Sequence, residues 1–165
     1  AADVRQFAAR VRTLDRAGHD FTCMSVALRS IADKLITQMP VPADRIVIDV
    51  SGDGHDNCNP RQPVDDVRDE LAARNVTVNG LPILEGDEAF TLEGWYREHV
   101  IGGPDSFLIP AADFADFERA FGGLHPTSSL SYSVLHFFAN GGGQAVVSRC
   151  IGSQKQVVYR QSAPA

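Results

Sequence analysis

Lysine is scarce in this sequence, and the basic residues nowhere gather into a dense run. Lys34 and Lys155 are the two lysines, and 15 Lys and Arg residues stand against 21 Asp and Glu residues, which gives a formal net charge of −6. Binding to nucleic acid through neutralisation of phosphates needs a concentrated basic surface. The charge pattern therefore argues against nucleic acid as a partner.

Long apolar runs and cysteines are also few. No apolar stretch approaches the roughly 20 residues that a membrane-spanning helix needs, so we expect no membrane span. The three cysteines, Cys23, Cys58 and Cys150, are too few for a disulfide framework and allow one bridge at most. We interpret Cys23 and Cys58 as buried, inert thiols. His55 and Cys58 have a spacing seen in zinc sites, but no second ligand pair accompanies them.

Signatures of catalysis are missing as well. The sequence contains no Gly-x-Ser-x-Gly elbow, which a serine hydrolase places between a strand and a helix. The Asn-Gly-Gly-Gly run at residues 140–143 follows a predicted helix, whereas phosphate-binding loops follow a strand. We interpret this run as the end of a helix. We therefore expect a protein that is not an enzyme.

Helical and extended patterns alternate along the first 121 residues. Apolar residues at helical spacing predict helices near residues 3–15, 22–38, 62–74, 90–99 and 112–121. Short runs rich in β-branched and apolar residues predict strands near residues 45–51, 76–81 and 106–109. Because the two kinds of element alternate, we expect an α/β fold whose parallel strands are joined by right-handed crossovers.

The composition changes near residues 122–129, where we place a boundary. Residues 130–139 form an apolar, aromatic run that we predict to be a helix packed on the sheet. Two strand-prone segments, at residues 145–150 and 156–159, are predicted to pair with each other. We expect one of them to lie beside the strand at 45–51, whose edge would otherwise be unpaired, within the chain or by exchange between two chains.

An acidic, hydroxyl-bearing loop ends the predicted strand at residues 45–51. The candidate side chains for binding a partner are Asp49, Ser51, Asp56 and Asn57. The carboxyl ends of parallel strands face the crevice where α/β proteins bind ligands, and oxygen ligands suit Mg²⁺ or Ca²⁺. An EF-hand is excluded, because its twelfth position is Pro60 where a bidentate Glu is needed. An Asp/Gly turn that satisfies its own backbone is the structural alternative.

Four motifs give residues 3–120 a resemblance to a bacterial family related to the von Willebrand factor A domain. They read RIVIDVSGDG at 45–54, VTVNGLPI at 76–83, WYREHVIGGPDSF at 95–107 and AADFADF at 111–117. The resemblance implies a three-layer, Rossmann-like sheet flanked by helices. It also implies that this chain is truncated at the N-terminus, without the opening strands of that fold, and carries an added helix and strands at the C-terminal end.

Domains of the von Willebrand A type hold Mg²⁺ at a metal-ion-dependent adhesion site, where a partner's carboxylate completes the coordination. Thr22 and Asp53 match two positions of that site, but the Asp-x-Ser-x-Ser motif is absent. With so incomplete a ligand set we expect no resident cofactor, and Mg²⁺ is the one ion that the resemblance implies. The implied function is a non-enzymatic, secreted or periplasmic module that binds a protein partner.

Residues 117–150 resemble a second family, the contractile phage tail sheath proteins. This resemblance rests on FERAFGGL at 117–124 and LSYSVLHFFANGGGQAVVSRC at 130–150. It implies an alternative function as a structural component of a contractile phage tail or a related injection device, located in a virion and able to form a homo-oligomer. We accordingly divide the chain into a partial von Willebrand A-like domain at residues 1–121 and a sheath-like extension at 122–165.

Overall fold

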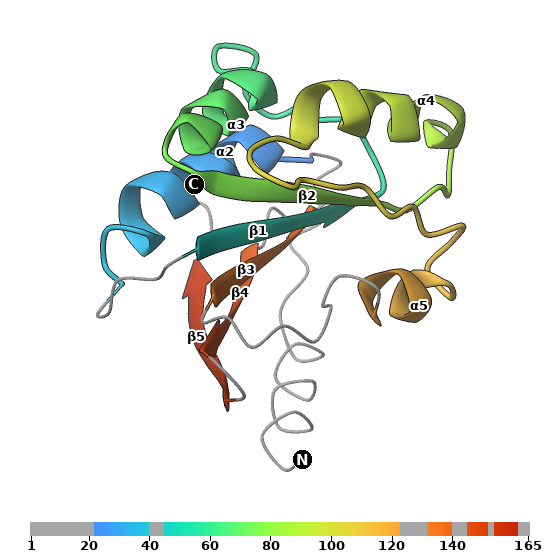
Figure 1. The fold of residues 1–165 in the computed structure, drawn as a ribbon. Helices are drawn as coiled ribbons and strands as arrows, with labels where there is room; N and C mark the ends of the chain where they lie inside the picture. Colours follow the sequence, from blue (N-terminus) through green and yellow to red (C-terminus); the bar gives the residue numbers. More distant parts are fainter. Residues whose placement is uncertain (1–21, 40–44, 123–131, 140–144, 152–153, 162–165) are drawn as a thin grey trace.

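The computed structural model describes residues 22–39, 45–122, 132–139, 145–151 and 154–161, and Figure 1 shows their arrangement. Helices and parallel strands alternate along the chain, which confirms the prediction of a mixed α/β fold. The helix predicted near residues 3–15 lies outside the described residues. Among the helices of the described ranges, none is both long and apolar enough to cross a membrane.

Three parallel strands form the central sheet in the order β2-β1-β3. The strands are β1 (Arg45–Gly52), β2 (Val76–Pro82) and β3 (Tyr132–Ala139). The predicted strands at 45–51 and 76–81 are therefore confirmed, together with their parallel pairing. β1 lies in the middle of the three, so its backbone is hydrogen-bonded on both sides, as a run rich in Val and Ile suits.

The strand predicted near residues 106–109 is present in part. Leu108 forms an isolated parallel bridge with Gly80, and Ala111 forms another with Ile83. This segment therefore runs parallel to β2, along the edge that faces away from β1, without forming a continuous ladder. A segment that touches its neighbour at two points has the position of a fourth strand but not its regular hydrogen bonding.

The helix predicted at residues 130–139 is wrong, because this segment is the strand β3, paired in parallel with β1. Short apolar runs do not distinguish a helix from a buried strand by periodicity, and Tyr, Val and Phe favour strands. The edge of β1 supplies the hydrogen bonds that decide the outcome. A tail strand does lie beside β1, as expected, but it is this segment.

The two strand-prone segments at the end of the chain form a separate antiparallel hairpin, as predicted. β4 (Ala145–Ile151) pairs with β5 (Gln154–Gln161), with a register irregularity in β4. The expectation that one of these two strands pairs with β1 is wrong, because β3 takes that place. In Figure 1 the hairpin lies on the β3 side of the sheet.

The predicted helices near 22–38, 62–74 and 90–99 are confirmed, the first two with shorter bounds and the third one residue longer at each end. They are α2 (Met24–Ser30) with its π-helical extension η1 (Ile31–Leu35), α3 (Val64–Ala73), and α4 (Ala89–Trp95) with its extension η2 (Tyr96–Val100). The last predicted helix begins late, because α5 spans Phe117–Gly122. The Asp116 carboxylate accepts a hydrogen bond from the Ala112 backbone at 3.0 Å, which closes a turn in place of the first helical residues.

The main core lies between β1, β2 and the helices α2, α3 and η2. Fully buried residues from all five elements form it, among them Met24, Leu28, Ile48, Leu71, Val78 and Tyr96. Gly80 on β2 is required by this packing, because a Cβ at Gly80 would lie 2.8 Å from the Tyr96 ring. η2 therefore lies close against β2, and in Figure 1 α3 and α4 lie on the same side of the sheet.

The opposite face of the sheet is more polar near its middle. Asp49 and Asn79 are aligned in the register of β1 and β2, and both are buried. A second, smaller apolar cluster covers the carboxyl end of β2 and is separate from the main core. It includes Leu81, Ile83 and Ala120 of α5. The sheet thus carries a large apolar core on one face and a buried polar pair on the other.

Candidate functional site

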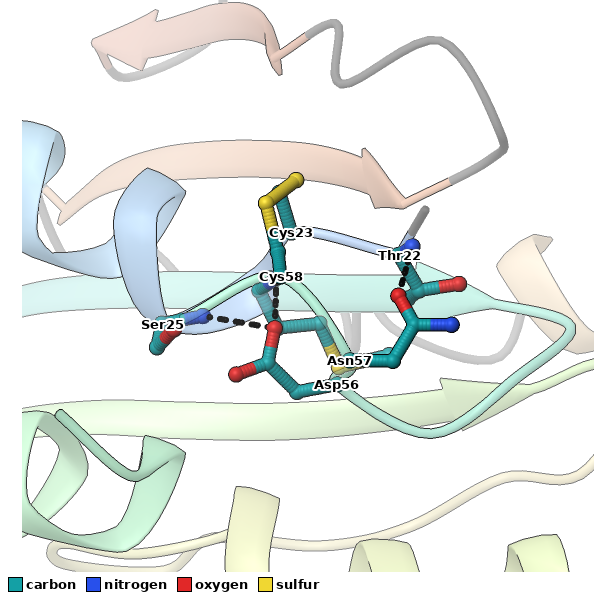
Figure 2. Close-up of a disulfide and its surroundings, with 7 residues drawn as sticks. Thr22, Cys23, Ser25, Asp56, Asn57 and Cys58 are labelled. Carbon is teal, nitrogen blue, oxygen red and sulfur yellow. Dashed lines mark hydrogen bonds between the residues drawn. A yellow bond between two sulfur atoms is a disulfide. The ribbon is translucent and has the colours of Figure 1, made fainter. Parts of the chain in front are cut away.

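The loop that follows β1 is bonded covalently to the residue before α2. Cys23 and Cys58 form a disulfide with a Cα–Cα distance of 4.9 Å, although 35 residues separate them (Figure 2). The prediction that both are inert thiols is therefore wrong, and a zinc site that uses Cys58 is excluded. Both cysteines are half-buried. The sequence limited the chain to one bridge, but the fold decides which cysteines meet.

Asp56 of this loop caps the helix α2. Its Oδ1 accepts hydrogen bonds from the backbone N–H groups of Met24 at 2.8 Å and Ser25 at 3.4 Å (Figure 2). The local N-cap residue, Cys23, makes no side-chain bond to the helix, so Asp56 supplies the acceptor from a distant part of the chain. Burial raises the pKa of Asp56, and the hydrogen bonds from Ser25 and Met24 oppose this shift.

Asn57 pairs with Thr22 in both directions. The Thr22 backbone N–H donates to Asn57 Oδ1 at 2.8 Å, and the Asn57 backbone N–H donates to the Thr22 carbonyl at 3.0 Å. Asn57 is exposed, whereas Thr22 is buried. Together with Asp56 and the disulfide, this pair holds the loop after β1 against the start of α2. The predicted binding residues Asp56 and Asn57 are thus brought together with Thr22.

Asp49 and Ser51, the other two predicted binding residues, lie in the interior. Asp49 is 1% exposed and Ser51 is 6% exposed, so neither reaches a partner at the surface, which corrects their expected role. The Asn79 side-chain amide donates to Asp49 Oδ1 at 2.9 Å. Burial raises the pKa of Asp49 to about 6, and the hydrogen bond from Asn79 opposes this shift. Strand alternation turns both side chains of β1 inward on the polar face.

Glu88 joins this region and was missed by the sequence analysis. Its Oε2 accepts a hydrogen bond from the His55 backbone at 2.7 Å. Gly54 lies close to the same oxygen. A Cβ atom added at Gly54 would lie 3.1 Å from Glu88 Oε2 and 3.2 Å from Thr22 Oγ1. Glu88 and His55 are 33 positions apart, and no short motif links them, so the sequence offered no signal for this contact.

The residues present do not fit the Mg²⁺ that the family resemblance implies. Thr22 and Asp53 lie at the same end of β1, but Asp56 Oδ1 and Glu88 Oε2 beside them already accept hydrogen bonds from backbone N–H groups. Within the described ranges, no group of three or more His, Cys, Asp and Glu side chains is placed to hold a metal ion. Mg²⁺ demands near-octahedral oxygen coordination, and this donor set does not supply it.

An exposed phenylalanine lies on the helix that contacts this loop. Phe90, at the start of α4, is 101% exposed. Trp95, at the end of the same helix, lies between two histidines. The centre of its ring is 4.9 Å from that of His55 and 5.4 Å from that of His99. The helix α4 therefore contacts the loop after β1 through His55, while Phe90 projects from it.

Hydrogen bonds join three loops into one surface at the carboxyl end of the sheet. The Leu84 backbone donates to the Ala111 carbonyl at 2.8 Å, and the Phe114 backbone donates to Glu85 Oε2 at 3.2 Å. We call the surface formed by residues 53–59, 83–90 and 111–116 the loop face. Figure 1 shows the beginning of α4 and the segment before α5 at this edge of the molecule.

Residues 1–122 match the model of a protein family described as a protein of unknown function, DUF1194. The chain belongs to this family. No curated protein and no solved structure matches the chain. The DUF1194 region contains β1, β2, the disulfide and the whole loop face. β3, β4 and β5 lie beyond it, so the third strand of the sheet comes from outside the DUF1194 region.

Proposed function

We propose that this DUF1194 protein is a non-enzymatic protein-binding module that contacts its partner through the loop face. The observation that carries the proposal is the side chain of Phe90, which is 101% exposed. A fully exposed Phe contributes strongly to binding once a partner covers it, since aromatic residues are enriched among the contacts that dominate interfaces. Phe114, 50% exposed, adds a second aromatic ring on the same face.

The construction of the loop face supports this role. Disulfide, backbone and carboxylate contacts hold its loops against one another and against α2, so little order remains to be gained on binding. Pre-organised loops lose less conformational entropy when a partner binds. Acidic side chains dominate the face, with exposed Glu85, Asp87 and Asp113. This charge favours a partner with complementary basic groups.

We also propose that this chain has the three-layer arrangement of the von Willebrand A fold. The parallel pairing of β1 and β2 and the helices beside these strands support this relationship. In that fold the neighbour of β1 would be an opening strand, and here β3 occupies the corresponding side. Thr22 and Asp53 lie at the edge where such domains bind partners. We propose that this chain binds without a cation.

The disulfide supports a location outside the cytoplasm. Disulfides form and persist in secreted and periplasmic proteins and are rare where thiols are kept reduced. The Cys23–Cys58 bond therefore favours the secreted or periplasmic location that the family resemblance implies. The observation concerns the compartment in which the chain folds and does not depend on the partner.

Site-directed photo-crosslinking tests the proposed face. A photoreactive phenylalanine replaces Phe90 in one variant and Thr37, an exposed residue beyond α2, in a matched control. We expect Phe90 crosslinks to a defined protein that untagged wild-type protein competes away and that untagged Phe90→Asp protein does not. Equal crosslinking from both positions, or equal competition by both proteins, would contradict the proposal.

The alternative function, assembly into a sheath-like structure, has a separate test. Light scattering across a range of protein concentrations distinguishes a monomer or dimer from large particles. The protein-binding proposal expects a mass that stays small as the concentration rises. Large particles that grow with concentration would favour the structural function in a contractile device.

A further inference from the structure

The contacts between the loop after β1 and the start of α2 depend on one reversible covalent bond. The disulfide joins Cys23, the N-cap residue of α2, to Cys58 at the far end of the loop (Figure 2). Between them, Asp56 and Asn57 make their hydrogen bonds to Met24, Ser25 and Thr22. The covalent bond and the hydrogen bonds therefore constrain the same two short segments.

These hydrogen bonds are long-range, and the disulfide lowers the cost of forming them. Asp56 and Met24 are separated by 32 positions, and Asn57 and Thr22 by 35 positions. A crosslink beside such contacts raises the effective concentration of donor and acceptor, because both partners are already held together. Without the crosslink, the loop has to find α2 again each time that it opens.

The disulfide lies outside the main core. Cys23 and Cys58 are both half-buried rather than enclosed in the core. Residues of the main core, such as Ile48 and Val78, are 0% exposed and belong to the β1–β2 ladder, which has its own hydrogen bonds. The bond can therefore open at the surface while the sheet beneath it keeps its contacts.

We propose that Cys23–Cys58 is a thiol–disulfide exchange site that acts as a latch on the loop face. One thiolate of a dithiol reductant attacks one sulfur, which forms a mixed disulfide with that cysteine, breaks the Cys23–Cys58 bond and releases the other cysteine as a thiolate that takes up a proton; the second thiol of the reductant then attacks the mixed disulfide and releases the first cysteine. Two thiols form in the protein, the reductant becomes a disulfide, and the two electrons come from its thiols. With the latch open, Asp56 and Asn57 leave α2 and residues 56–59 lose their fixed position, while His55 keeps its contacts with Glu88 and Trp95.

The consequence for binding rests on the proposed function, since the latch controls the order of the loop face itself. The closed latch presents a rigid loop to the partner, and the open latch presents a loop that binding would have to order. Binding to the reduced protein is therefore weaker. The latch itself is a property of the free chain and is measured without a partner.

Amide hydrogen exchange on the whole chain, with and without dithiothreitol, tests the latch. After reduction we expect the amides of Thr22, Met24 and Ser25 to exchange at least about tenfold faster, the factor expected when an N-cap contact is lost. The amides of Ile48 and Val78 keep their protection. Reoxidation restores the slow exchange, and a Cys150→Ser variant responds in the same way as the wild type.

Two results would overturn the latch. Unchanged exchange at the three loop-contact amides after complete reduction would show that the hydrogen bonds hold without the disulfide. Equal loss of protection at Ile48 and Val78 would show that the bond maintains the whole fold instead. A Cys23→Ala, Cys58→Ala double variant repeats the test without reductant. Crosslinking from Phe90 is scored separately, so failure of the latch and failure of the proposed function are distinguishable.

Discussion

Asp49 and Asp56 belong to the same strand and the loop that ends it, yet their surroundings differ. Asp49 lies inside the sheet, 1% exposed, with the Asn79 amide as donor to its Oδ1. Asp56 lies half-buried at the surface and accepts hydrogen bonds from two backbone N–H groups of α2. Both carboxylates have a raised pKa because burial disfavours the charged form, and for Asp49 the pKa reaches about 6.

The comparison shows that an acidic residue at the end of a strand can serve two unrelated purposes. Asp56 meets aligned backbone N–H groups at a helix N-terminus, where a negative charge is stabilised. Asp49 meets a neutral amide in an interior where ionisation is costly. The first residue therefore builds the loop face, and the second makes the fold sensitive to pH.

The largest expected effect concerns the pH dependence of stability at Asp49. A pKa raised from 3.8 to about 6 corresponds to roughly 3 kcal/mol of differential stability. Because the folded pKa exceeds the unfolded one, the free energy of unfolding falls as the pH rises from about 4 to about 6. Asp49→Asn should remove this decrease, as measured by urea unfolding at each pH, while the exposed Asp87→Asn control retains it. An unchanged decrease in Asp49→Asn would contradict the assignment.

The next effect concerns the partner of Asp49. Asn79→Ala removes the donor to Asp49 and the acceptor of the Phe107 backbone N–H, which leaves buried polar groups without these bonds. We expect a loss of about 2 kcal/mol in the free energy of unfolding at pH 7 and a smaller loss at low pH, where Asp49 is neutral. The control is Asn59→Ala, which loses one local bond to Arg61. Equal losses in the free energy of unfolding of the two variants would show that the buried Asp49–Asn79 pair stabilises the fold no more than a local surface hydrogen bond does.

A smaller effect is expected at Asp56. Asp56→Ala removes the cap of α2 and should lower the free energy of unfolding by about 1 kcal/mol, within the usual range for an N-cap. Asp56→Asn keeps an acceptor oxygen and should lose less. Chemical denaturation of the oxidised protein measures both changes. If Asp56→Ala were as stable as the wild type, the disulfide alone would hold the loop.

The smallest effect compares two glycines. A methyl group at Gly54 meets Glu88 Oε2 at 3.1 Å and Thr22 Oγ1 at 3.2 Å, whereas a methyl group at Gly94 meets nothing within 4 Å. Gly94 lies in α4, so Gly94→Ala should increase the free energy of unfolding by about 0.5 kcal/mol or more and thereby raise the thermal midpoint. Gly54→Ala should lower it slightly, because both oxygens have to move. A gain at both positions would mean that the loop is more loosely packed than the structure shows.

Much of the fold was predictable because the signals are local. Val and Ile runs identified β1 and β2, and apolar spacing with Pro63 and two early aspartates identified α3. The helix prediction for residues 130–139 was wrong, because their apolar, aromatic character suits a helix and a strand alike. The unpaired side of β1 decided between the two, and no window of the sequence around β3 contains that information.

The candidate site was predictable in composition but not in its contacts. The sequence identified the acidic loop after β1, yet it assigned Asp49 and Asp56 the same surface role. Their positions along the strand and loop give them opposite surroundings, which depend on what packs against each. Glu88 was missed for the same reason, since its contact with His55 exists through the packing of α4 on the loop.

The sequence by itself determined the alternation of helices and strands, the lack of a dense run of basic residues and the limit of one disulfide. Each of these follows from composition or from spacing over a few residues. The tertiary structure alone decided that Cys23 meets Cys58, that Asp56 caps α2 and that β3 pairs with β1. These contacts join distant segments, and they form because the packed core fixes the geometry that brings the partners together and offsets the entropy lost in closing the loops.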